Sequence, residues 1–207
     1  MKFIITFLLC FVLKQGFSQN TNYLKANAQT ILLADPTVFE NEGTYYLYGT
    51  NNDPSIKEQG FLVYTSKDLR EWKGPVGAKD GFALKKGDSF GTKGFWAPQV
   101  FKYKGIFYMA YTADEQIAIA TAKSPLGPFL NSSAKALEAP VKQIDPFIFI
   151  DEEGKKYLYH VRLQDGNRIF VAEMNDDFKS IKTETLQEII SGEEEWENTQ
   201  NVEWLMN

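Results

Sequence analysis

Two aspartates in the same local context are the residues of this chain best suited to chemistry. Asp35 and Asp145 each precede a proline that opens an apolar run, at residues 36–39 and 146–149. The context recurs at residues 96–98, Trp-Ala-Pro, where alanine takes the place of the aspartate. Because Ala97 shows that this position needs no carboxylate for its structure, we interpret the two aspartates as functional. Simple Asp-Pro turn chemistry is the alternative interpretation.

Two carboxylates that face one cavity suit the hydrolysis of a glycosidic bond. One carboxylate activates a water molecule, and an acid protonates the departing oxygen. Trp96 and Phe95 precede the alanine of the second context, and an aromatic face there could stack on a sugar ring. Packing between neighbouring structural units is the alternative role for Trp96.

Other polar residues carry weaker signals. Arg162 lies two positions after His160 and points to the same side of a strand. We expect Arg162 to reach a sugar hydroxyl or a catalytic carboxylate, and His160 to be a satisfied core or channel residue. Residues 51–53, Asn-Asn-Asp, follow an aromatic strand and form either a loop at the cavity or a plain turn.

A threefold repeat must position these side chains. Each unit has a proline-led apolar strand, a glycine turn (Gly43, Gly105 and Gly154) and an aromatic strand. A third strand is predicted at 61–66, 116–122 and 168–174, followed by a turn and often by an aromatic near a fourth strand. Four short antiparallel strands per unit are the plan of a β-propeller blade. A β-sandwich is the alternative, but it does not explain the repeated proline-led start.

The spacing of the repeat predicts an incomplete propeller. The prolines at 36, 98 and 146 are 62 and 48 residues apart, so the chain holds about three blades. Propellers close with four to eight blades, and a fourth inner strand is expected near position 201. The residue before each proline is expected to be extended, which would place residues 35, 97 and 145 around one mouth of a central channel.

Composition excludes several classes of protein. The formal charge is −5, with 22 Lys and Arg against 27 Asp and Glu, which argues against a protein that coats nucleic acid. One Cys and one His exclude a disulfide framework, a cysteine zinc site and histidine-rich metal catalysis. No cofactor is expected, and a structural calcium ion is left open. We interpret the glycine-rich residues 74–94 as a surface loop and the acidic residues 193–197 as a solvated loop.

The first nineteen residues are typical of a secretory signal peptide. Residues 1–19 have a basic start at Lys2, an apolar run at 3–13, and small residues at Gly16 and Ser18. The run is too short to span a membrane. We therefore expect a secreted or periplasmic protein whose mature domain, residues 20–207, is a monomer without a transmembrane segment.

The strand starts at residues 34–36, 96–98 and 144–146 resemble glycoside hydrolase family 43, and the similarity covers about 34–207. The resemblance implies an all-β, five-bladed β-propeller and an inverting enzyme of the α-L-arabinofuranosidase or β-xylosidase type. It also implies that Asp35 is the general base and that Asp145 tunes the pKa and orientation of the general acid.

The family's general acid has no counterpart in this sequence. In the family it is the Glu of a Glu-Gly-Pro that opens the fourth inner strand, and the chain contains no such tripeptide. Glu203 is the nearest glutamate, but it lacks the Gly-Pro and is not assigned the role. We therefore expect an incomplete form of the enzyme. The alternative is a non-catalytic carbohydrate-binding propeller; a fructan-acting five-bladed hydrolase fits less well, because its Asn-Asp-Pro-Asn-Gly start is missing.

Overall fold

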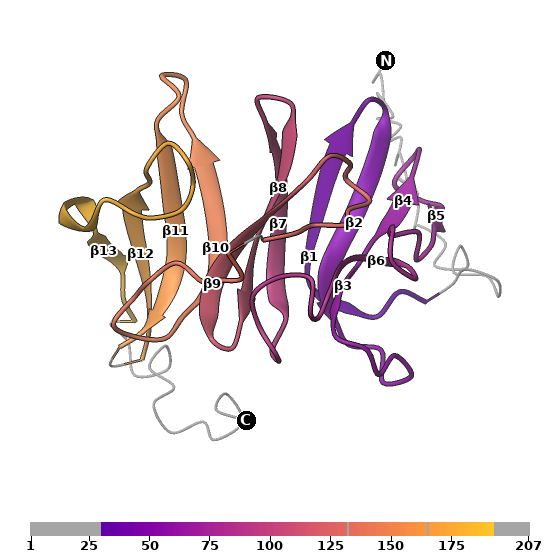
Figure 1. Cartoon of the computed structure of the whole chain (residues 1–207), viewed down its shortest axis with the longest axis horizontal. Helices are drawn as coiled ribbons and strands as arrows, with labels where there is room; N and C mark the ends of the chain where they lie inside the picture. Colours follow the sequence, from indigo (N-terminus) through magenta and orange to yellow (C-terminus); the bar gives the residue numbers. More distant parts are fainter. Residues whose placement is uncertain (1–29, 132, 165, 193–207) are drawn as a thin grey trace, which may run out of the picture.

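Three antiparallel sheets stand side by side as blades in the computed structural model, which describes residues 30–131, 133–164 and 166–192 (Figure 1). Blade I contains β1 (Leu33–Asn41), β2 (Thr44–Asn51), β4 (Tyr64–Ser66) and β5 (Trp72–Lys73); blade II contains β7 (Trp96–Tyr103), β8 (Ile106–Ala113) and β9 (Gln116–Ala122); blade III contains β10 (Gln143–Ile150), β11 (Lys156–Leu163), β12 (Asn167–Glu173) and β13 (Gln187–Ile190). A short 3-10 helix, η2 (Thr183–Thr185), precedes β13. The predicted all-β fold with three repeated blades is confirmed.

Tight turns set the register of the first hairpin in blades I and II. Glu42 and Gly43 have φ values of 53° and 69°, and Lys104 and Gly105 have values of 47° and 81°. Two central residues with positive φ define the type I′ turn, whose twist matches that of the flanking strands. The turns pair Asn41 with Thr44 in blade I, so the inner strand is aligned with its neighbour from the first residue onward.

Two cores hold the blades together. The inner strands β1, β7 and β10 contact one another in sequence order. Blades I and II enclose a core that includes Tyr48, Phe61, Met109 and Tyr111, all fully buried. Blades II and III enclose a second core that includes Ile117, Ile148, Leu158 and Phe178. Burial of these side chains between sheets supplies the main favourable free energy of the fold, and each blade needs its neighbour to bury them.

A glutamine joins the inner strands of blades II and III. The Gln99 amide nitrogen donates to the carbonyl oxygen of Ile148 (3.0 Å), and the Ile148 backbone nitrogen donates to the Gln99 amide oxygen (2.5 Å). The side chain thus satisfies two backbone groups of β10 that lie outside the ladder between β10 and β11.

Blade I differs from the predicted plan in its third strand. Residues 61–66 were expected to form one strand, but β3 (Gly60–Leu62) pairs with β6 (Phe82–Lys85) in a separate two-stranded sheet, while β4 pairs with β2. The prediction that 74–94 is a surface loop is therefore wrong in part. Phe82, Ala83 and Leu84 are buried because they pack against the outer side of blade I and against blade II.

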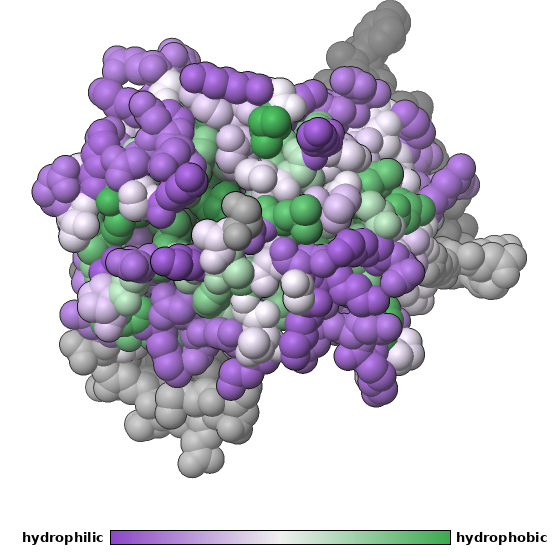
Figure 2. Space-filling model, in the orientation of Figure 1, coloured by the Kyte–Doolittle hydropathy of each residue, from purple (hydrophilic) through white to green (hydrophobic). Residues whose placement is uncertain are grey.

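Some predictions fall on residues that the structure does not describe. The signal peptide at 1–19, the acidic run at 193–197, the fourth inner strand near 201 and Glu203 all lie outside the described residues. In the described part of blade II the predicted fourth strand is reduced to a single bridge between Thr121 and Leu130. On the face of the molecule seen in Figure 2, hydrophobic side chains reach the surface in separate patches between hydrophilic ones.

Candidate active site

A bulge at the start of each inner strand shapes the candidate site. The pairing of β1 with β2 shifts register between Ala34 and Thr37, and β7 and β10 shift at the corresponding places. Two residues on the inner strand then oppose one on its neighbour, which re-aims the side chains of the bulge. The opposing residues are Gly49, Tyr111 and His160 in blades I, II and III.

The residue before each proline is left-handed, so the prediction of an extended conformation is wrong. The φ values are 47° at Asp35, 44° at Ala97 and 56° at Asp145. The bulge imposes this conformation, and it outweighs the local preference that proline exerts on its predecessor. Aspartate tolerates the left-handed region better than alanine does, since its short polar side chain bonds locally.

Two threonines link the bulges of blades II and III to the preceding blade. The Thr50 hydroxyl accepts the backbone N–H of Ala97 (2.9 Å), and the Thr112 hydroxyl accepts that of Asp145 (2.9 Å). Thr50 also donates its proton to the Asp35 carboxylate (2.7 Å). Since the Thr50 oxygen is already an acceptor for blade II, its proton is directed at Asp35 and fixes that carboxylate.

Asp35 and Asp145 interact electrostatically although 110 positions of chain separate them. Partial burial raises the pKa of the Asp145 carboxyl, and the negative charge of Asp35 raises it further. A like charge has this effect only at short range. Asp35 and Asp145 also occupy the same bulge position, at the start of β1 and at the start of β10.

A pocket adjoins Asp35 between blades I and II. Its volume is about 460 Å³, and its lining includes Thr50, residues 51–54 and Trp96. Trp96 is 36% exposed and forms part of the wall, as a sugar-stacking residue should. Residues 51–53 thus lie at the mouth, and they are also a turn: Ser55 donates its N–H and hydroxyl to Asp53, which lowers the pKa of the Asp53 carboxyl.

Phe95 serves the core more than the pocket. Only 6% of the residue is exposed, and its ring stacks on Tyr111 at 6.2 Å and meets Phe61 edge-on at 5.9 Å. We therefore do not retain Phe95 as a substrate contact. Of these two neighbouring aromatic residues, Phe95 turns its side chain into the core, whereas Trp96 stays partly exposed.

Arg162 is bonded to a histidine and to neither of the two aspartates among the described residues. The residue is 6% exposed, and its Nε donates to Nε2 of His160 at 3.1 Å. Among the described residues it forms no ion pair with Asp35 or Asp145, so the expected contact with a catalytic carboxylate is not observed. Burial and the neighbouring guanidinium lower the pKa of His160 to about 4, which keeps this histidine neutral.

The described residues offer no evident metal centre. No group of three or more His, Cys, Asp or Glu side chains is placed there to hold an ion. A helix long and apolar enough to cross a membrane is likewise missing from the part of the chain that the structure describes.

The repeated blades, with an aspartate at the bulge of blades I and III, define a β-propeller with paired carboxylates. The family model for glycosyl hydrolases family 43 matches residues 29–204, and the chain belongs to this family. The structure superposes on an endo-1,4-β-xylanase from Bacteroides thetaiotaomicron with a TM-score of 0.73 and 44% identity, covering 81% of this chain and 56% of that one. A thermostable family-43 glycoside hydrolase gives a TM-score of 0.67 and 35% identity, covering 79% and 55%.

Curated relatives agree with this assignment. An extracellular exo-α-(1→5)-L-arabinofuranosidase from Cellvibrio japonicus is 24% identical, over 74% of this chain and 47% of that enzyme. An arabinoxylan arabinofuranohydrolase from Bacillus subtilis is 28% identical, over 61% and 30%. The chain spans half or less of the length of these relatives. The family, suggested by the three strand starts, and the propeller fold, predicted from the strand repeat, are thus confirmed.

Proposed function

We propose that this chain carries the water-activating half of an inverting glycoside hydrolase that acts on arabinose- or xylose-containing glycans. Asp35 is the general base and Asp145 sets the electrostatics of the acid's surroundings. One observation carries the proposal: two carboxylates from blades I and III are held by identical bulges at one mouth, beside a pocket with an exposed tryptophan. The named activities of the relatives supply the substrate class.

The fixed carboxylate of Asp35 supports the role of base. In an inverting reaction the base draws a proton from a water molecule that attacks the anomeric carbon from the face opposite the leaving group. Thr50 holds one carboxylate oxygen of Asp35, and no described residue bonds to the other oxygen, which is placed to accept that proton. The acid that protonates the leaving oxygen has no assigned residue, because the sequence lacks the expected Glu-Gly-Pro.

Leaving-group chemistry gives a sharp test. An α-L-arabinofuranosyl or β-D-xylosyl fluoride departs with little need of an acid, so turnover then depends on the base and on sugar binding. We expect this chain to hydrolyse one of these fluorides with inversion, and Asp35→Asn to lower kcat about 10²- to 10⁴-fold. Asp80→Asn, on an exposed loop of blade I, is the matched control and should leave the rate unchanged.

Two results would count against the assignment. Undiminished turnover by Asp35→Asn removes Asp35 from the role of base, and a product with retained configuration removes the inverting mechanism. Binding of arabino- or xylo-oligosaccharides without turnover of either fluoride would favour the non-catalytic carbohydrate-binding propeller. Secretion goes with the proposal, because the exo-arabinofuranosidase relative is named as extracellular.

A further inference from the structure

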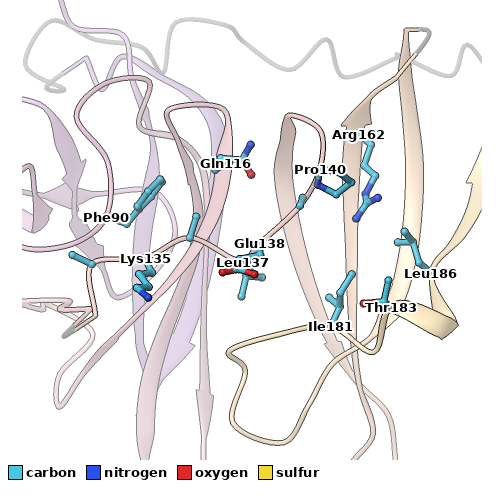
Figure 3. A pocket seen from close by; sticks show the side chains of 13 residues that line it. Phe90, Gln116, Lys135, Leu137, Glu138, Pro140, Arg162, Ile181, Thr183 and Leu186 are labelled. Carbon is cyan, nitrogen blue, oxygen red and sulfur yellow. The ribbon is translucent and has the colours of Figure 1, made fainter.

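A second, larger pocket lies between blades II and III, and neither of the two aspartates lines it. Its volume is about 1020 Å³, and it is bounded by residues 134–140, by the start of β9 and by the segment before β13 (Figure 3). Leu137, Pro140, Ile181 and Leu186 provide apolar walls. It shares no lining residue with the pocket that holds Trp96.

Arg162 enters this pocket from β11 with an incomplete set of partners (Figure 3). Its Nε donates to His160, and its guanidinium lies over the Phe170 ring at 5.4 Å from the centroid. Within the described residues the guanidinium forms no ion pair, although the residue is only 6% exposed. A buried cation without a counter-charge is costly, and burial accordingly lowers the pKa of Arg162.

His160 cannot provide the missing negative charge. It is neutral, and its Nε2 accepts from Arg162, so the ring proton sits on Nδ1. That Nδ1 is buried without a hydrogen-bond partner. Arg162 and His160 together therefore offer hydrogen-bond donors and no negative charge.

Three carboxylates of the surrounding elements are already paired with a lysine or an arginine. Glu115, at the turn before β9, pairs with Lys142 at 2.5 Å. Glu173 of β12 pairs with Lys182, and Glu188 of β13 pairs with Arg168. On the pocket wall itself, Glu138 is exposed and is accompanied by Lys135 of opposite charge. Among the described residues, neither these carboxylates nor Glu138 forms an ion pair with Arg162, so the guanidinium is able to take an anion from a ligand.

We propose that the pocket between blades II and III binds a carboxylate-bearing sugar, a uronate, whose carboxylate takes the free N–H groups of the Arg162 guanidinium. The planar guanidinium matches a carboxylate with two parallel hydrogen bonds. Gln116 and Thr183 line the same space. The Gln116 amide nitrogen already donates to the Val141 carbonyl oxygen (3.3 Å), so the Gln116 amide oxygen and the Thr183 hydroxyl are the groups that suit sugar hydroxyls, while Leu137 and Pro140 suit the C–H face of the ring. The pocket would anchor an acidic side group independently of cleavage at Asp35.

Titration of the ¹⁵N-labelled chain with D-glucuronate tests the site without any need for enzyme activity. D-glucose is the matched neutral probe, and acetate provides the carboxylate without the ring. We expect glucuronate to shift the Arg162 Nε–H and His160 signals and to bind at least about tenfold more tightly than either control probe. Arg162→Gln should abolish this preference, whereas Lys86→Gln, which removes an exposed charge elsewhere, should keep it.

A second variant guards against misfolding of Arg162→Gln. Ala136→Trp fills the pocket from the opposite wall while leaving Arg162 in place, and it should weaken glucuronate binding by a similar factor. Equal binding of glucose and glucuronate, shifts confined to the Trp96 pocket, or an unchanged affinity in both variants would overturn the proposal. None of these results bears on turnover at Asp35, so the two proposals fail separately.

Discussion

At the scale of single residues, Thr50 and Thr112 have the same role in linking two blades but differ in one side-chain hydrogen bond. Each hydroxyl accepts a backbone N–H from the following blade, and only Thr50 also donates to a carboxylate, since Ala97 replaces the aspartate in blade II. The chain thus contains its own control for separating the packing of blades from the fixing of Asp35.

We predict that Thr50→Val lowers kcat on a glycosyl fluoride by about tenfold, the equivalent of one charge-assisted hydrogen bond. Thr50→Ser keeps the hydroxyl and should retain most of the rate. Both Thr50→Val and Thr112→Val should lower the melting temperature to a similar degree, because each loses one link between blades. A rate for Thr50→Val equal to that of Thr50→Ser would show that the bond to Asp35 is not needed.

The free energy of unfolding should depend on pH through His160, the only histidine of the chain. Its folded pKa of about 4 lies below the ordinary 6.5, so the unfolded state binds more protons between these values. The free energy of unfolding should therefore fall as pH drops from 6.5 to 4, by at most about 3 kcal/mol.

Urea unfolding of wild type and His160→Gln across this range checks the prediction. The glutamine amide can still accept from Arg162 but does not titrate, so the variant should lose less stability on acidification. Parallel curves for the two proteins would mean that His160 is not the group responsible.

At the scale of elements, one side chain secures the contact between two inner strands. Gln99 satisfies both backbone groups of Ile148, and the corresponding positions of β1 and β10 are held by Thr37 and Phe147, which cannot form this pair of bonds. Blades II and III are therefore joined by a pair of hydrogen bonds from one side chain to the backbone, and no described residue forms such a pair between blades I and II.

Gln99→Leu should lower the free energy of unfolding by about 2 kcal/mol, because two buried backbone groups lose their partners. Gln99→Glu keeps the acceptor for the Ile148 N–H but at neutral pH sets a carboxylate oxygen against the Ile148 carbonyl oxygen, so its loss of stability should shrink when the carboxyl is protonated at low pH. Thr37→Leu is the positional control in blade I and should change stability little. Chemical denaturation measures all three, and an equal loss in Gln99→Leu and Thr37→Leu would contradict the assignment.

At the scale of the whole molecule, blade III presents an apolar face that no described residue covers. Ile148 points into the core with blade II, so its neighbours Phe147 and Phe149 point the other way and are 53% and 47% exposed. Phe149 stacks on Tyr157 at 6.4 Å on this same face. Exposed faces of this kind promote association.

Phe149→Ser should therefore reduce concentration-dependent association of the chain while lowering the free energy of unfolding by less than about 1 kcal/mol. Leu69→Ser, which removes a side chain of similar exposure from a turn of blade I, is the control and should leave association unchanged. Sedimentation velocity across a range of concentrations gives the answer. Equal association of both variants would show that the blade III face is not involved.

The sequence by itself determined the blades and the pair of aspartates. Proline-led strands, glycine turns and aromatic strands are local signals, and their repetition predicted the bounds of β9 and β12 to within one residue. Comparison of Asp35 with Ala97 singled out the carboxylates, because a repeat shows which residues the architecture does not need.

Tertiary structure alone decided the backbone at those aspartates and the partners of the other polar residues. The left-handed φ at Asp35 depends on a bulge against β2, a pairing that local preference before proline does not reveal. Phe95 was expected to contact substrate, but packing between blades buries its ring in the core, and the partner of the Arg162 Nε is His160. Strand alternation fixes the side on which a residue lies, whereas contacts between blades far apart in sequence decide what it meets there.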